Sequence, residues 1–248
     1  MKKEVAAILT VVITGAVLTL TGCNESAVDT PSVSWQITQN QDSIKFTWDA
    51  IQDADGYIVK YNGIEDTIQV TSYTLGEPTT EVEIVAYKGS DESDPWTHSF
   101  AAVETQNLDW YTRADTDPSH PSGLGFNNDG SVVTISYAQG DHNAIDFVAD
   151  NDNSITAIQE LDGNVNKYNA VAFSATYDYN TMNMAPETGY TTYEQVVQQG
   201  TFALLKDTDG QKNDNDIYAK LYVKGIDGTR WTVDVTVQPI GGLRWLVK

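Results

Sequence analysis

Apolar and polar side chains alternate along most of the chain after residue 32, in short runs that are separated by turn residues. In the stretch SIKFTWDAI every second residue is apolar, so Ile44, Phe46 and Trp48 share one face of a predicted strand. The stretch RWTVDVTV, residues 230–237, alternates in the same way, which predicts one buried face and one face in water. Asp-Gly pairs, which favour tight hairpins, lie near the ends of several runs. The pattern therefore predicts an all-β protein.

The first group of predicted strands covers residues 33–102. A strand that ends in Trp48 is followed by GYIVKYNG, which places Tyr57 and Tyr61 on one face, and then by TEVEIVAYKGS. This order of a strand tryptophan, a Tyr-x-Val-x-Tyr strand and a Val-x-Ile-x-Ala strand resembles a fibronectin type III module, although Thr80 stands where the family usually has its corner tyrosine. The resemblance implies a β-sandwich with Trp48, Tyr57 and Tyr61 in its core. Such modules serve as spacers or binding units, so the fold alone assigns no function.

A second domain is expected over residues 111–248, after a linker at residues 103–110. Eight further runs have strand character, among them SVVTISYA, AVAFSATYDY and DIYAKLYVKGI. A helix is predicted only after Thr191, because Glu194 completes a capping-box spacing and Gly200 can end the helix. Eight short strands and one short helix predict an antiparallel β-sandwich of jelly-roll-like type.

The phrases GLGF, AIDFVAD, MAPETGY and GTFALLKDTDG are similar to the C-terminal domain of surface lipoproteins from Bacteroidetes-type bacteria, and distantly to the HmuY-like haem-binding lipoproteins. The resemblance spans residues 123–248 and implies a β-rich surface domain, with haem capture as one use. Haem capture requires axial ligands, typically histidine or methionine. The available side chains are those of His98, His120, His142, Met182 and Met184.

The N-terminus has the features of a secretory signal. Two lysines precede an apolar run that ends in the sequence LTGC, and this ending resembles the bacterial lipobox. The resemblance implies that residues 1–22 are removed and that Cys23, the only cysteine, carries the lipid anchor. Asn24 in place of aspartate favours the outer membrane, and residues 23–32 are expected to act as a tether.

The charge of the chain restricts its partners. It contains 14 basic and 35 acidic side chains, and removal of two lysines and one glutamate with the signal leaves 12 and 34, a net charge of −22. Nucleic acid and anionic lipid heads repel so acidic a surface. We therefore expect no nucleic-acid partner, and attachment to a membrane only through Cys23.

Few residues indicate catalysis. The sequence contains no nucleophile elbow, no phosphate-binding glycine loop and no histidine pair at metal-site spacing, so we expect a protein that is not an enzyme. Four tryptophans, Trp96, Trp110, Trp231 and Trp245, are either a sugar-stacking platform or half-buried core residues.

The stretch LLKDTDGQKNDNDIYAK contains Asp207, Asp209, Asp214 and Asp216 around one glycine. The spacing does not fit an EF-hand, which needs glycine at position 6 and glutamate at position 12. The four aspartates are either ligands of a calcium ion or part of an acidic hairpin turn, the role that Asp-Gly pairs have elsewhere in the chain.

Taken with the lipobox, these features predict a cell-surface lipoprotein that acts as a non-catalytic binding or assembly module. Two alternatives remain open: capture of haem, a small ligand or a glycan, and a structural role in a surface complex or extracellular filament. An enclosed pocket would favour ligand capture, whereas a contiguous exposed apolar strip would favour assembly.

Overall fold

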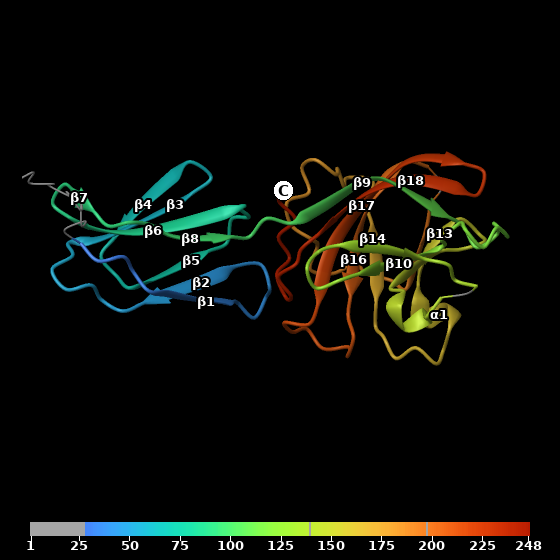
Figure 1. The fold of residues 1–248 in the computed structure, drawn as a ribbon, viewed down its shortest axis with the longest axis horizontal. Helices are drawn as coiled ribbons and strands as arrows, with labels where there is room; N and C mark the ends of the chain where they lie inside the picture. Colours follow the sequence, from blue (N-terminus) through green and yellow to red (C-terminus); the bar gives the residue numbers. More distant parts are fainter. Residues whose placement is uncertain (1–27, 139, 197) are drawn as a thin grey trace, which may run out of the picture.

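The computed structural model describes residues 28–138, 140–196 and 198–248. These residues form two antiparallel β-sandwiches that lie end to end, the first on the left of Figure 1 and the second on the right, so the all-β prediction is confirmed. Residues 1–22 and Cys23, the predicted signal and lipidation site, lie outside the described residues. Within the described ranges, no helix is long and apolar enough to cross a membrane.

The first domain packs a three-stranded sheet against a five-stranded one. The three strands, in sheet order, are β1 (Val33–Ile37), β2 (Ile44–Trp48) and β5 (Ser72–Leu75). The other sheet contains β4 (Ile64–Ile68), β3 (Gly56–Tyr61), β6 (Glu81–Lys88) and β7 (Asp91–Glu92), with β8 (Trp96–Ser99) also paired to β6. The alternating residues Ile44, Phe46 and Trp48 are buried, and Tyr57 and Tyr61 pack in the same core, as the sequence predicts.

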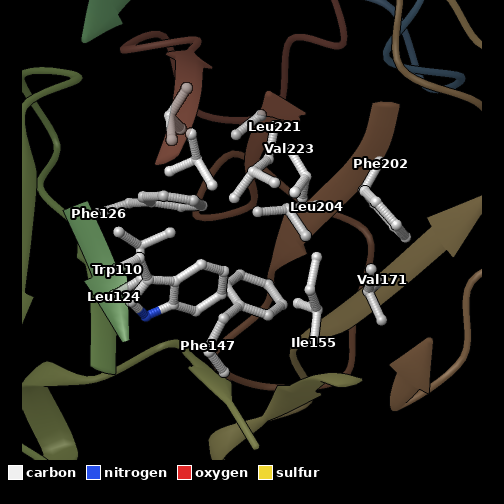
Figure 2. Packing of buried hydrophobic residues seen from close by; sticks show 14 of the residues in the cluster. Trp110, Leu124, Phe126, Phe147, Ile155, Val171, Phe202, Leu204, Leu221 and Val223 are labelled. Carbon is white, nitrogen blue, oxygen red and sulfur yellow. The ribbon is translucent and has the colours of Figure 1, made fainter. Parts of the chain in front are cut away.

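The second domain packs two five-stranded sheets face to face. One contains β11 (Val132–Ile135), β10 (Gly123–Phe126), β12 (Phe147–Ala149), β13 (Ser154–Ala157) and β15 (Tyr193–Gln195). The other contains β14 (Ala170–Phe173), β16 (Gly200–Lys206), β17 (Ile217–Asp227), β18 (Arg230–Val237) and β9 (Val103–Tyr111). Figure 2 shows Phe126 and Phe147 of the first sheet packed near Leu204 and Leu221 of the second.

Two local predictions are wrong. Residues 103–110, predicted as a linker, are nearly all of strand β9, because β9 pairs with β18 along its length. Among the described residues after Thr191 the predicted helix does not occur, since Tyr193–Gln195 pairs with β13 as an edge strand. The α-helix of the described chain is instead α1 (Ile158–Leu161), and a 3₁₀ turn, η1, covers His142–Ala144. In both places sheet pairing overrides the local signal.

The outer face of the sheet that runs from β14 to β9 is covered by a segment of the chain and is not exposed to solvent. Residues 174–190, here called the strap, cross this face between β14 and β15. Tyr179 of the strap shares a hydrogen bond with Thr236 between their hydroxyl oxygens, at 2.7 Å, and Lys220 donates from Nζ to the carbonyl oxygen of Met182 at 3.0 Å. Thr236, which lies on the face predicted to be in water, is therefore fully buried.

The two domains share a buried interface. Trp245, near the C-terminus, is fully buried in the core of the first domain, edge-on to Phe100 at 5.8 Å between ring centroids. Its Nε1 donates to the carbonyl oxygen of Asp42 at 2.8 Å. Beside it, Oε1 of Gln41 accepts from the hydroxyl of Tyr218 at 2.6 Å. The domains are thus joined by side-chain packing as well as by the chain itself.

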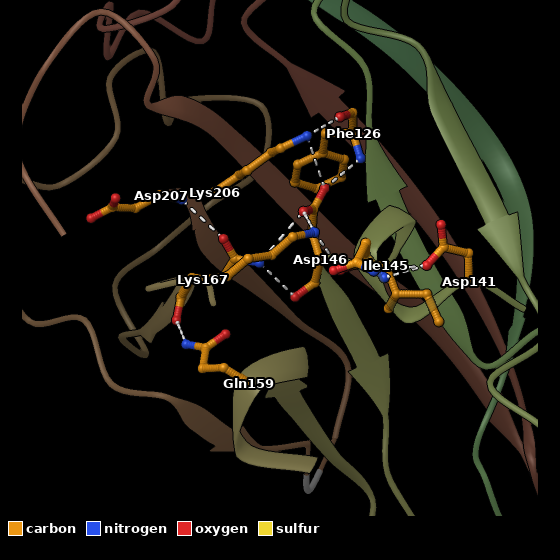
Figure 3. Close-up of polar contacts among 10 residues, drawn as sticks. Phe126, Asp141, Ile145, Asp146, Gln159, Lys167, Lys206 and Asp207 are labelled. Atoms are coloured by element: carbon orange, nitrogen blue, oxygen red, sulfur yellow. Dashed lines mark hydrogen bonds and ion pairs between the residues drawn. The ribbon is translucent and has the colours of Figure 1, made fainter. Parts of the chain in front are cut away.

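A buried ion cluster fastens the two sheets of the second domain to each other. The carboxylate of Asp146, which has no exposed surface, accepts from the amide of Phe126 at 2.7 Å and from Nζ of Lys167 at 2.8 Å. Nζ of Lys206 lies 3.4 Å from the same carboxylate (Figure 3). Because Phe126 and Lys206 belong to different sheets, Asp146 links them by charge and hydrogen bonds.

Candidate functional site

The far end of the second domain is built around residues 112–122, here called the distal loop. Strand β9 and the turn between β17 and β18 extend to this end, away from the first domain (Figure 1). The backbone amide of Arg113 donates to the carbonyl oxygen of Ala149 at 2.8 Å, and the indole of buried Trp110 donates to the carbonyl oxygen of Ser122 at 2.8 Å. These bonds hold both ends of the loop against the sandwich.

A pocket of about 500 Å³ lies between the distal loop and residues 136–138, which follow β11. This volume is in the range of sites for small molecules, about 300–1,000 Å³. The residues that line the pocket are Arg113, Asp115, Thr116, Asp117, Pro118, His120, Ser122, Ser136, Tyr137 and Ala138. The lining therefore combines one cation, one imidazole, two carboxylates and several hydroxyl groups.

One wall is formed by Arg113 and Tyr137, which belong to a stack of three planar groups. The guanidinium of Arg113 lies over the ring of Tyr137, with Cζ 4.4 Å from its centroid, and His142 stacks on the same ring with centroids 4.4 Å apart. Arg113 also pairs with Asp150, whose Oδ1 is 3.2 Å from its Nη1. Nδ1 of His142 lies 2.7 Å from Oδ2 of Asp162, so the stack is fixed at both ends.

His120 forms another wall and belongs to a second stack. The imidazole of His120 lies parallel to the ring of Tyr111, with centroids 3.9 Å apart. Nδ1 of His120 is 3.1 Å from Oδ2 of Asp115, and Nε2 is 3.9 Å from Oδ2 of Asp117. Asp115 is in turn held by the hydroxyl of Thr229 at 2.8 Å. His120 is thus supported by an aromatic ring behind it and by carboxylates at its edge.

The charges around the pocket follow from these contacts. The hydrogen bond to Asp162 raises the pKa of His142, because both ring nitrogens face oxygen acceptors. The backbone amide of Asp117 lowers the pKa of Asp115, and the hydroxyl of Ser119 lowers the pKa of Asp117. At neutral pH both aspartates are therefore ionised acceptors, close to the positively charged Arg113.

Four aspartates, Asp207, Asp209, Asp214 and Asp216, are candidate calcium ligands, and three of them, Asp207, Asp209 and Asp216, have other contacts. Asp207 accepts from the amide of Asp209 at 2.9 Å, and Asp209 accepts from the side chain of Asn213 at 2.8 Å, which are contacts of a turn. Across the described residues, no group of three or more histidine, cysteine, aspartate or glutamate side chains is placed to hold a metal ion. The geometry gives no support to the calcium hypothesis.

Asp216 belongs to the interface between the domains. It is buried, and its Oδ2 accepts from Nε2 of Gln41 at 3.0 Å and from the amide of Asn213 at 3.1 Å. Burial raises the pKa of Asp216. Asp216 therefore connects the loop of residues 207–216 to the first domain.

The candidate haem ligands are not brought together. His98 lies in the first domain, where burial lowers its pKa. His120 and His142 lie at the distal end of the second domain. Met182 and Met184 belong to the strap, and Met184 packs against the core of the first domain. His120 and His142 are thus at the opposite end of the second domain from Met182 and Met184.

The tryptophans form cores and not a platform. Trp110 and Trp231 are fully buried in the second domain, as an edge-to-face pair with centroids 5.6 Å apart. Trp245 is buried at the interface, and Trp96 is half-buried in the first domain. Of the two interpretations of these residues, the core role is confirmed for Trp110, Trp231 and Trp245.

Sequence reasoning missed Arg113 and Tyr137 as site residues. A signal was present in RADTDPSH, where one arginine, two aspartates and one histidine occur within eight residues. Tyr137 had none, because it comes from a distant turn and reaches Arg113 only through folding.

No protein-family model and no curated protein matches the chain. Among solved structures, the chain is similar to a crystal structure of a DUF4466 family protein from Parabacteroides merdae ATCC 43184. The two are 12% identical with a TM-score of 0.37, over 85% of this chain and 99% of that one. A similarity this low carries no argument about function.

Proposed function

We propose that the chain is a lipid-anchored cell-surface protein that binds a small ligand in the distal pocket and performs no reaction on it. The position of the pocket carries the proposal. The described chain begins at the end of the first domain that faces away from the second, and strand β9 runs from the first domain toward the opposite end of the molecule (Figure 1). The distal loop, which lines the pocket, follows β9 directly. A chain tethered through Cys23 would hold the pocket as far from the membrane as its two domains allow.

The first domain suits the role of a spacer. Its strand order, β1-β2-β5 against β4-β3-β6, supports the proposal that it is a fibronectin type III-like module. The buried contacts of Trp245 and Gln41 hold the second domain on it in one orientation. A firmly joined pair of domains keeps the pocket pointed outward, which a flexible linker would not do.

The side chains of the pocket favour binding over catalysis. In the part of the chain that the structure describes, His120 and His142 contact aspartates and no serine or threonine hydroxyl. Nucleophilic catalysis needs a base within hydrogen-bond reach of its nucleophile. Fixed planar groups and ionised acceptors are instead typical of a preorganised binding site.

Two experiments test the proposal. Labelling of cells with palmitate should mark the wild-type protein and not Cys23→Ser; retention of Cys23→Ser in the membrane fraction would contradict the anchor. A library of small polar fragments, screened against the full-length protein by ligand-observed NMR, should give hits that disappear in Thr116→Trp. Thr116 is an exposed residue of the pocket lining, so a tryptophan there fills the pocket and leaves packed residues in place. Fragment binding that is unchanged in Thr116→Trp would contradict the distal site.

A further inference from the structure

We infer that the ligand of the distal pocket is an uncharged saccharide. The inference rests on the proposed function, that this pocket binds a ligand, and names the chemical class of that ligand. Three properties of the pocket carry it: fixed donors and acceptors side by side, charges of both signs, and flat polar groups with aromatic backing.

The donors and acceptors are held in place before any ligand arrives. Asp115 and Asp117 are acceptors only, since both are ionised. Arg113 is a donor only, fixed by Asp150 and by the ring of Tyr137. A hydroxyl group both donates and accepts, so adjacent hydroxyls of a sugar can satisfy a carboxylate and a guanidinium at the same time. A ligand with only one kind of group leaves part of this lining unpaired, which costs binding energy.

An ion of either sign would meet at least one like charge in this pocket. An anion would lie near the two carboxylates of Asp115 and Asp117, and a cation would lie near the guanidinium of Arg113. Like charges at contact distance repel each other, so each of these arrangements includes an unfavourable contact. A neutral, hydroxyl-rich molecule meets neither penalty.

The planar groups provide flat surfaces for a sugar ring. Tyr111 backs His120 but does not line the pocket, so the imidazole lies between that tyrosine and the cavity. The guanidinium of Arg113 also stacks on an aromatic ring, that of Tyr137, and both residues line the pocket. Both groups are already immobilised by stacking, so little side-chain entropy remains to be lost when a ligand binds.

The test uses three panels of oligosaccharides: neutral hexose and pentose oligomers, uronic-acid oligomers and glucosamine oligomers. Each is titrated by calorimetry into the full-length protein, in a detergent without a sugar headgroup. We expect a neutral saccharide to bind more tightly than either charged class. Arg113→Ala should weaken this binding about tenfold or more, since hydrogen bonds to a charged group are worth about 1.5–3 kcal/mol and 1.4 kcal/mol is tenfold.

Two variants control for folding and location. Thr116→Trp should abolish saccharide binding without disturbing the packed stacks. Arg230→Ala should leave binding unchanged, because Arg230 makes a bidentate pair with Asp109 and does not line the pocket.

Tighter binding of a uronic-acid or glucosamine oligomer, or saccharide binding that persists in Arg113→Ala and Thr116→Trp, would overturn the inference. Absence of binding by all three panels would overturn it as well. The fragment screen distinguishes failure of the saccharide inference from failure of the proposed function. If fragments still bind at the pocket, the proposed function stands and only the saccharide inference is wrong. If no fragment binds there, both are wrong.

Discussion

Trp245→Ala is expected to uncouple the two domains. The tryptophan has no exposed surface and lies in the core of the first domain, although it follows the last strand of the second. A buried tryptophan covers about 150–250 Å², which at about 25 cal/mol per Å² is worth about 4–6 kcal/mol. The bond from its Nε1 to Asp42 adds about 1 kcal/mol. Measured Trp→Ala changes in cores cost about 3–5 kcal/mol, so we expect a loss of about 4 kcal/mol.

This loss is large beside the total stability of a domain, about 5–15 kcal/mol. Urea denaturation followed by far-UV circular dichroism should show one transition for the wild type and two for Trp245→Ala, with the first domain unfolding earlier. Hydrogen exchange should report faster exchange at the amide of Arg244, which donates to the carbonyl of Gln41. Trp96→Ala is the matched control, because Trp96 packs in the same core and is half-buried. A single transition within about 0.5 kcal/mol of the wild type would refute the reasoning.

Three further predictions concern buried or paired ionisable groups. Asp146→Asn should lower the free energy of unfolding by about 3–5 kcal/mol in urea titrations, because it leaves two lysines without their buried counter-charge; a loss below about 1 kcal/mol would argue against the cluster. NMR titration should find the pKa of His142 above its ordinary value in the wild type and lower in Asp162→Asn. The stability that the His142–Asp162 pair adds is complete below about pH 6.5 and is lost as the pH rises through the raised pKa. An unchanged pKa of His142 in Asp162→Asn would count against the pair. Burial lowers the pKa of Lys220 to about 8, so above that pH the unfolded state binds more protons than the folded state. Between pH 8 and 9.5 the free energy of unfolding of the wild type should therefore rise by roughly 1.5 kcal/mol relative to that of Lys220→Met. Parallel pH profiles of the two proteins would contradict this.

The first domain could be predicted from sequence because its signals are local. Alternation at period two assigns Ile44, Phe46 and Trp48 to one face, and the structure buries all three. The same reasoning identifies the strand at residues 230–237 and its buried face. These predictions need only the geometry of an extended chain, in which successive side chains point to opposite faces.

The burial of the other face of residues 230–237 depends on a segment elsewhere in the chain. Thr236 is buried only because the strap crosses it, and no pattern within residues 230–237 contains that information. Residues 103–110 have the composition of a linker and become a strand because β18 offers them a partner. The capping-box spacing at Thr191 is likewise overruled by the pairing of Tyr193–Gln195 with β13.

The candidate site depends on tertiary structure more than the strands do. The sequence determines the residue types of the distal loop and their proximity to one another. Only the fold places Tyr137 under Arg113, Asp150 beside that guanidinium and Thr229 against Asp115. A hydrophobic pattern predicts which side chains become buried, because the alternation within each strand decides which face meets the core. It does not record which distant polar groups meet, because those contacts arise only when the sheets have packed.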